Sequence, residues 1–187
     1  MLTDRRPSAL VLASAALLLL AMPLVATFDD LMATGATYTG AVGPLDALAP
    51  LEARMAAGLL GWIGIPAGVS GPLLVLQVPH GAPLTLWITW NCVGWQSLVL
   101  LVISLVAGLR GDLTWNARVQ VTVAGLAGTV LVNVLRMVVV ALIAAFVGVR
   151  TAVLLHDYGG TLLLVAWLLA FWAAADRWLL AGGEAEA

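Results

Sequence analysis

The sequence contains little charge and no lysine. Only 10% of its 187 residues are charged, all eight basic residues are arginines, and the formal net charge is −2. So weak a charge offers nothing to a polyanion, and we expect no nucleic-acid partner. Hydrophobic residues make up 63% of the chain, far more than a soluble domain of this size can place on its surface. The composition therefore predicts a membrane protein that is embedded in the lipid bilayer.

Cysteine and histidine are also scarce. Cys92 is the only cysteine, which excludes an internal disulfide, a redox pair and a cysteine-clustered metal site. Two histidines, His80 and His156, are too few for a metal centre, so we expect neither a metal nor another cofactor. The sequence motifs of serine and metal intramembrane proteases do not appear either, which disfavours those enzyme classes.

Long apolar runs dominate what remains. Four segments are long enough to cross a bilayer core of about 30 Å, namely residues 8–27, 91–109, 119–136 and 160–180. The predicted fold class is an all-α polytopic membrane protein, with residues 1–187 forming a single transmembrane domain. The first run is longer than the usual core of a signal peptide, so we expect it to stay as a membrane helix.

Two further segments lie between or beside these spans. The apolar sequence continues past Arg136 through residues 137–149, which predicts a break near Arg136 followed by a re-entrant or tilted piece. In the segment 28–90, residues 51–66 predict either an amphipathic helix in the membrane interface or a re-entrant half-span. Two β-rich runs around the turn PHGAP then predict a short hairpin that leads directly into Cys92.

The positions of the arginines predict the orientation. With the N-terminus in the cytoplasm, five arginines lie inside and three lie outside or at the outer boundary. The inner set is Arg5, Arg6, Arg110, Arg118 and Arg177, and the outer set is Arg54, Arg136 and Arg150. This orientation predicts a multi-pass protein of the plasma membrane whose segment 28–90 is extracytoplasmic.

Three chemically distinctive residues lie at one depth in this arrangement. Cys92 is 18 residues from Arg110, and Arg136 is 18 residues from Arg118. His156 is 21 residues from Arg177. At 1.5 Å per residue these separations are about 27 to 31 Å, or one membrane thickness. Cys92, Arg136 and His156 are therefore expected to emerge together on the outer face.

A thiol, an imidazole and a guanidinium suit acyl transfer. The thiolate attacks a carbonyl, the imidazole carries protons, and the guanidinium stabilises the oxyanion that develops. An arginine surrounded by apolar residues is costly unless it faces a polar site or reaches the interface. The alternative is a non-enzymatic membrane subunit, an assembly factor or transporter component, with an inert cysteine and with Arg136 paired to a partner's acid.

The order of three short motifs resembles the exosortase/archaeosortase family of membrane cysteine transpeptidases. Cys92-Val-Gly94 opens a span, Asn133-Val-Leu-Arg136 follows, and His156 stands in HDYGG. The resemblance covers about residues 52–180. Val93 departs from the small or hydroxyl residue that often follows the cysteine.

The resemblance implies both a fold and a reaction. Packed transmembrane helices would hold Cys92 as nucleophile, His156 as general acid/base and Arg136 as oxyanion stabiliser on the extracytoplasmic side. The substrates would be secreted proteins with a C-terminal sorting signal that contains a transmembrane helix. Cleavage would release the protein from this anchor and pass it to a lipid or another amine acceptor.

Four neighbours are predicted to support this triad. Asn133 lies one helical turn before Arg136 and is expected to orient it. Gly94 is expected to let the substrate backbone approach the thiol. Asp157 is expected to orient His156, and Asn91, next to Cys92, completes the set.

Overall fold

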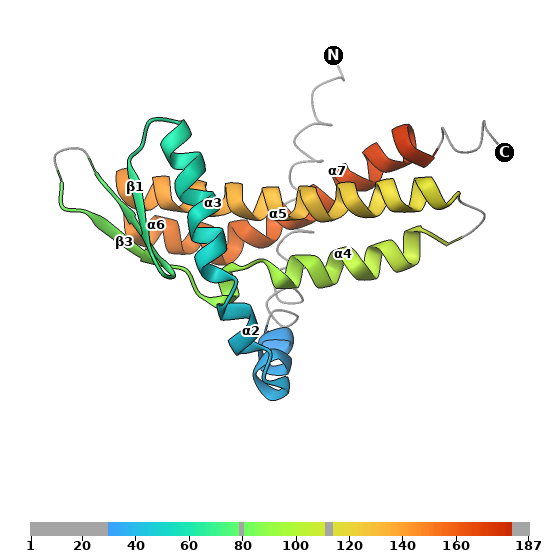
Figure 1. Ribbon diagram of the computed structural model, residues 1–187, viewed down its shortest axis with the longest axis horizontal. Coiled ribbons are helices and arrows are strands. Elements are labelled where there is room, and N and C mark those ends of the chain that lie inside the picture. Colours follow the sequence, from blue (N-terminus) through green and yellow to red (C-terminus); the bar gives the residue numbers. More distant parts are fainter. Residues whose placement is uncertain (1–29, 79–80, 111–113, 181–187) are drawn as a thin grey trace, which may run out of the picture. The chain divides into compact units, whose positions relative to one another are not determined.

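The computed structural model describes residues 30–78, 81–110 and 114–180 (Figure 1). The chain divides into two compact units, residues 1–41 and 42–187. Residues 30–39 of the first unit are helical. The predicted span 8–27 lies outside the described residues, and the helices and strands described below belong to the second unit.

The second unit is mostly helical, as predicted, and holds one small sheet. Its helices are α2 (Val42–Asp46), α3 (Ala49–Trp62), α4 (Trp95–Gly108), α5 (Trp115–Phe146), α6 (Val149–Leu154) and α7 (Gly160–Ala174). Its strands are β1 (Ala67–Ser70), β2 (Leu73–Leu76) and β3 (Leu84–Trp87). A 3-10 turn, η1 (Trp90–Cys92), precedes α4, and two π-helical turns, η2 (Leu155–Gly159) and η3 (Ala175–Leu180), flank α7.

Two of the described helices are long and apolar enough to cross a membrane. They cover Trp90–Gly108 and Trp115–Phe146 and contain most or all of the predicted spans 91–109 and 119–136. A third span is formed if the pair Val149–Gly159 and Leu162–Arg177, bent by 43°, counts as one. The described residues therefore supply two or three of the four predicted spans.

The predicted break near Arg136 is wrong, because α5 continues for 32 residues from Trp115 to Phe146. No proline or glycine lies between residues 129 and 146, so nothing in the sequence interrupts the helix. The C-terminal half of α5 also packs against α3 and α6. At about 48 Å the helix is longer than the hydrocarbon core is thick. The chain turns at Gly148, whose φ of 133° is a backbone conformation that glycine adopts readily and other residues rarely do.

The predicted hairpin is part of a three-stranded antiparallel sheet in the order β1-β2-β3. The two β-rich runs form β2 and β3, and β3 leads into η1 as expected. β1 is an additional strand, missed because its sequence AGVS is short and contains glycine. One face of the sheet belongs to a core shared with α3 and α5, and that face carries Ala67, Val69, Leu74, Leu76, Leu84 and Leu86.

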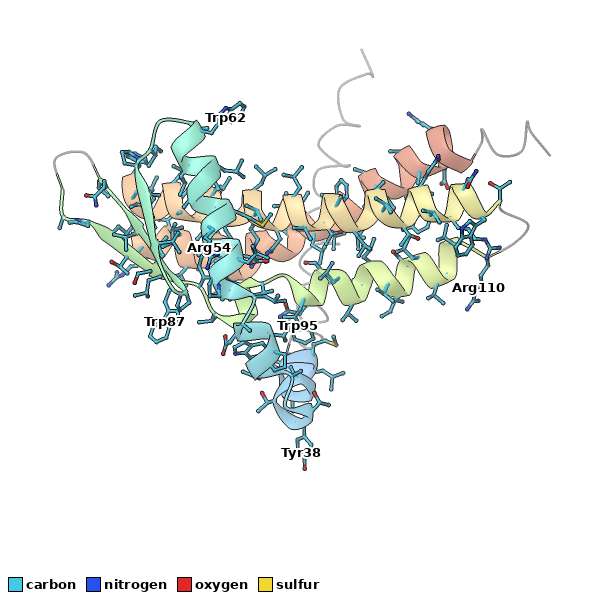
Figure 2. All side chains as sticks on the ribbon, in the orientation of Figure 1. Tyr38, Arg54, Trp62, Trp87, Trp95 and Arg110 are labelled. Atoms are coloured by element: carbon cyan, nitrogen blue, oxygen red, sulfur yellow. The ribbon has the colours of Figure 1, made fainter. Side chains whose placement is uncertain are left out.

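Helix α3 confirms a helix within residues 51–66 and covers this core. At 14 residues it extends about 21 Å, too short to cross a bilayer alone. Its buried face repeats at helical spacing through Glu52, Ala56 and Leu60. Trp62, at its end, is 87% exposed and points away from the core (Figure 2).

A second core joins α4, α5 and the α7–η3 segment. It contains Leu101, Leu105, Val121, Phe171 and Ala175. Glycine lets the aromatic rings of α7 approach, because a Cβ on Gly128 would lie 2.2 Å from the Trp167 ring. Arg110 marks the end of this bundle opposite Trp95 (Figure 2), while the sheet and α3 gather around the other end of α5 (Figure 1).

A proline in the second half of α5 tests its continuity. Val139 is 45% exposed within α5, so Val139→Pro removes a backbone hydrogen bond without emptying the core. We expect a loss of about 3 kcal/mol or more relative to Val139→Ala, measured by thermal unfolding in detergent. Equal Tm values for the two variants would show that the helix breaks after Arg136.

Candidate active site

Three elements bring Cys92, Arg136 and His156 into contact. The Cys92 Sγ lies 3.5 Å from His156 Nε2, and Arg136 Nη2 lies 3.4 Å from the same nitrogen. Cys92 ends η1, Arg136 stands in the second half of α5, and His156 belongs to η2. Their catalytic roles stay predictions, but their meeting at one point agrees with the helix spacing.

The cysteine stands on a tight turn that is held from two sides. Its N–H donates to the Thr89 carbonyl at 2.8 Å, and the Thr89 hydroxyl lies 3.7 Å from the thiol. The N–H of Trp90 donates to Asp46 Oδ1 of α2 at 2.8 Å. These bonds place Cys92 just before α4, with its side chain partly buried.

His156 is oriented by its neighbour in sequence. Its Nδ1 lies 3.0 Å from Asp157 Oδ1. An ionised carboxylate only accepts hydrogen bonds, so Nδ1 carries the proton in this contact. In the neutral ring, Nε2 then presents its lone pair to Cys92 and Arg136, as a general base requires. The π-helical turn that carries His156 and Asp157 is a feature found often at functional sites.

Asn133 links three parts of the site by hydrogen bonds. Its Nδ2 donates to the Cys92 carbonyl at 2.9 Å and to Glu52 Oε1 at 3.1 Å. The amide therefore ties α5 to the cysteine turn and to α3. The orientation of Arg136 by Asn133 stays a prediction, and the Arg136 charge acts on Glu52, the carboxyl group that Asn133 bonds.

Gly94 also has a structural reason that the sequence did not reveal. Its φ of 68° is left-handed, and a Cβ would lie 2.5 Å from Asn133 Cγ. Glycine is therefore required for the approach of Asn133, and the approach of a substrate to Gly94 stays a prediction. Gly160 plays a similar part, because a Cβ there would lie 2.9 Å from Arg136 Nη1.

Asn91 is not brought to the thiol. Its side chain is exposed, and its Oδ1 accepts from Gln96 Nε2 at 3.3 Å. It therefore lies at an exposed position of η1.

The sequence interpretation missed Glu52. This residue is only 7% exposed, and its Oε2 is buried without a hydrogen-bond partner among the described residues. Burial raises the pKa of Glu52 to about 7, although the Asn133 hydrogen bond and the Arg136 charge oppose the change. The alignment of Glu52 with Ala56 and Leu60 at intervals of four residues was the signal that it lies on a buried face.

A cavity of about 230 Å³ opens beside the thiol. Its walls come from the sheet, from α5 and from α6, and the site forms one end. It is lined by Leu74, Leu86, Trp87, Ile88, Cys92, Met137, Val140, Ala144, Val149, Ala152, Val153, His156 and Asp157. Apart from the three site residues, these side chains are apolar, which suits an apolar segment of a ligand.

A comparison with protein families identifies the family of the chain. A family model described as a transmembrane exosortase matches residues 5–173. The chain belongs to the transmembrane exosortase family. As a family member it is a membrane protein, and the match spans all three motifs of the site. No curated protein and no solved structure matches this exosortase-family chain.

The contact between Gly94 and Asn133 is testable by stability. We expect Gly94→Ala to lower stability by about 2 kcal/mol or more, because the Cβ meets Asn133 and the left-handed backbone is strained. Gly58→Ala is the matched control, since Gly58 is helical with nothing within 4 Å of an added Cβ. It should gain about 0.5–1 kcal/mol. Unfolding in detergent measures both, and equal changes would contradict this packing.

The raised pKa of Glu52 predicts a dependence of stability on pH. The folded carboxyl ionises near 7 and the unfolded one near 4.5. Its contribution to stability is thus complete below 4.5 and is lost as the pH rises through 7. We expect the Tm of the wild type to fall relative to Glu52→Gln between pH 5 and pH 8. Asp30→Asn, at an exposed position, is the control. If the Tm of Glu52→Gln and of the wild type change in parallel with pH, the pKa of Glu52 is not raised.

Proposed function

We propose that this exosortase-family protein is a cysteine protease and transpeptidase that cleaves the C-terminal sorting signals of secreted proteins. The observation that carries the proposal is the contact of the Cys92 thiol with the His156 imidazole at 3.5 Å, with Asp157 on the other ring nitrogen. A nucleophile, a base and a group that orients the base form the general pattern of covalent acyl transfer.

The first half of the reaction forms a thioester. The thiol gives its proton to Nε2 of His156 and attacks the scissile carbonyl, and the Arg136 guanidinium stabilises the resulting oxyanion. The C–N bond then breaks, and the imidazolium returns the proton to the leaving amine. The substrate's N-terminal part stays on Cys92, while its membrane helix leaves.

The second half releases the product. A neutral amine of a lipid or another acceptor attacks the thioester and gives a proton to His156 as the new C–N bond forms. The C–S bond then breaks, and the imidazolium returns that proton to the Cys92 thiolate. Water in place of the amine gives hydrolysis.

The orientation of the site in the membrane is part of the proposal. Arg118 and Arg136 lie on one continuous helix, 18 residues or about 27 Å apart. Arg110, Arg118 and Arg177 all lie near the same end of the α4–α5–α7 bundle. Placing that end in the cytoplasm puts Cys92 at the outer surface of the plasma membrane, where secreted proteins and lipid amines meet it.

The experiment compares secreted proteins in strains that carry different variants of the chain. In a strain without the native gene, the wild type should restore removal of C-terminal membrane helices from a set of secreted proteins. Cys92→Ala should restore none, and His156→Ala should slow processing by about 10²–10⁴-fold. Mass spectrometry of C-terminal peptides identifies the substrates, and pulse-chase labelling gives the rates.

Asn91→Ala is the matched control, because this exposed neighbour makes no contact with the thiol in the described structure. It should process at the wild-type rate. If Cys92→Ala restores processing fully, the cysteine is inert and the protein is a non-enzymatic subunit, the alternative reading of the sequence.

A further inference from the structure

The cavity beside Cys92 has one wall that is the free edge of a sheet. β3 pairs with β2, and no other described strand lies on its second side. Leu86, Trp87 and Ile88 form this wall, and Val149, Ala152 and Val153 of α6 form the opposite one. Each of these two walls is followed in the sequence by a residue of the site, because β3 leads to Cys92 and α6 leads to His156. The space between them therefore ends at the thiol.

The pairing pattern shows which backbone groups face this space. Ile88 N–H donates to the Pro72 carbonyl, and Leu74 is opposite Leu86 in the register. In an antiparallel pair the hydrogen-bonded positions alternate. Leu84, Leu86 and Ile88 thus direct their backbone groups to β2, while Thr85 and Trp87 direct theirs to the open edge. Between β1 and β2, Gln77 N–H donates to the Pro66 carbonyl, so the odd-numbered residues of β2 direct their backbone groups to β1 and the even-numbered ones to β3.

We propose that the free edge of β3 binds an extended segment of the substrate as a fourth strand, with apolar side chains of that segment in the 230 Å³ cavity. This inference rests on the proposed transpeptidase function and specifies how that site holds its substrate. Unpaired backbone groups of an edge strand provide the hydrogen bonds of such strand addition, and the neighbouring pocket selects the side chains.

The size and lining of the cavity define the chemistry of the segment. At 230 Å³ it is smaller than the roughly 300–1,000 Å³ of pockets for drug-sized ligands. It admits one or two side chains and excludes a helix, whose diameter is about 10 Å. Its lining beyond the site residues is apolar and carries no arginine. The segment bound here is therefore extended and places a small or medium apolar residue in the cavity.

The position of the sheet determines which part of the substrate, before or after the scissile bond, binds to β3. β3 and α6 lie at the end of α5 away from the Arg110 end of α4 (Figure 1, Figure 2). The substrate's own membrane helix follows the scissile bond and runs into the bilayer toward the arginine end. The segment on β3 is consequently the one that precedes the scissile bond and becomes the acyl group of the thioester.

A proline at Thr85 tests the strand addition. Thr85→Pro removes an N–H that faces the open edge and breaks no bond to β2, and proline is tolerated on edge strands. The substrates for this test are the secreted proteins that the wild type processes and Cys92→Ala does not. We expect Thr85→Pro to reduce the rate of their processing by at least about tenfold. This factor corresponds to the loss of one hydrogen bond of about 1.4 kcal/mol. Thr85→Ala should process normally. Both variants should react at Cys92 with a small thiol reagent at the wild-type rate, which shows that the fold and the thiol are intact.

A direct measurement uses the single cysteine of the chain. Cys92→Ala is cysteine-free, so Thr85→Cys in that background can be crosslinked by oxidation to single cysteines placed along the substrate. Crosslinks at alternate positions before the cleavage site support the fourth strand. Crosslinks only after that site, or equal processing by Thr85→Pro and Thr85→Ala, would overturn it. Failure of the wild type to process any secreted protein would instead refute the proposed function.

Discussion

The two hydrogen bonds from the Asn133 amide are the interaction on which the site depends. One reaches the Cys92 carbonyl and the other reaches Glu52, so a single buried side chain connects the cysteine turn, α3 and α5. In apolar surroundings an unsatisfied amide or carbonyl costs on the order of 1–3 kcal/mol. The geometry that satisfies Asn133 therefore also fixes where the thiol lies relative to α5. Arg136 follows one turn later on the same helix, which sets the distance from the guanidinium to the thiol.

Other features of the site follow from this buried amide. Gly94 has no side chain and a left-handed backbone because the amide occupies the place of a Cβ. Glu52 accepts from the amide through one oxygen, while its second oxygen has no partner among the described residues. A buried carboxyl in this state favours its neutral form, which explains the pKa of about 7. The charge of Arg136 counteracts that preference. Near neutral pH, the Glu52 carboxyl is therefore balanced between its neutral and its charged form, one hydrogen-bonded residue away from the cysteine turn.

The contacts of the triad could be anticipated from the sequence because the rise per residue of an α-helix is constant. Counting from the arginines placed Cys92, Arg136 and His156 at one depth, and in the structure the Cys92 thiol and the Arg136 guanidinium both lie within 3.5 Å of His156 Nε2. What the sequence hid depends on tertiary contacts. The second half of α5 stays helical because α3 and α6 pack on it, and AGVS becomes a strand because β2 lies beside it. Glu52 escaped notice because a charged residue is usually exposed, and only its place on the buried face of α3 reveals otherwise.

The continuity of α5 fixes the cavity relative to the cysteine turn. Asn133, Met137, Val140 and Ala144 follow one another at three- and four-residue intervals, so they form one stripe along the helix. The first bonds the cysteine turn, and the other three line the cavity. A break at Arg136 would separate the two functions of this stripe and leave the cavity free to move relative to the thiol. Because the helix is unbroken, the part that spans the membrane, the part that carries the guanidinium and the floor of the cavity share one axis. The excess length of α5 over a membrane span is thus what aligns the cavity with the Cys92 thiol.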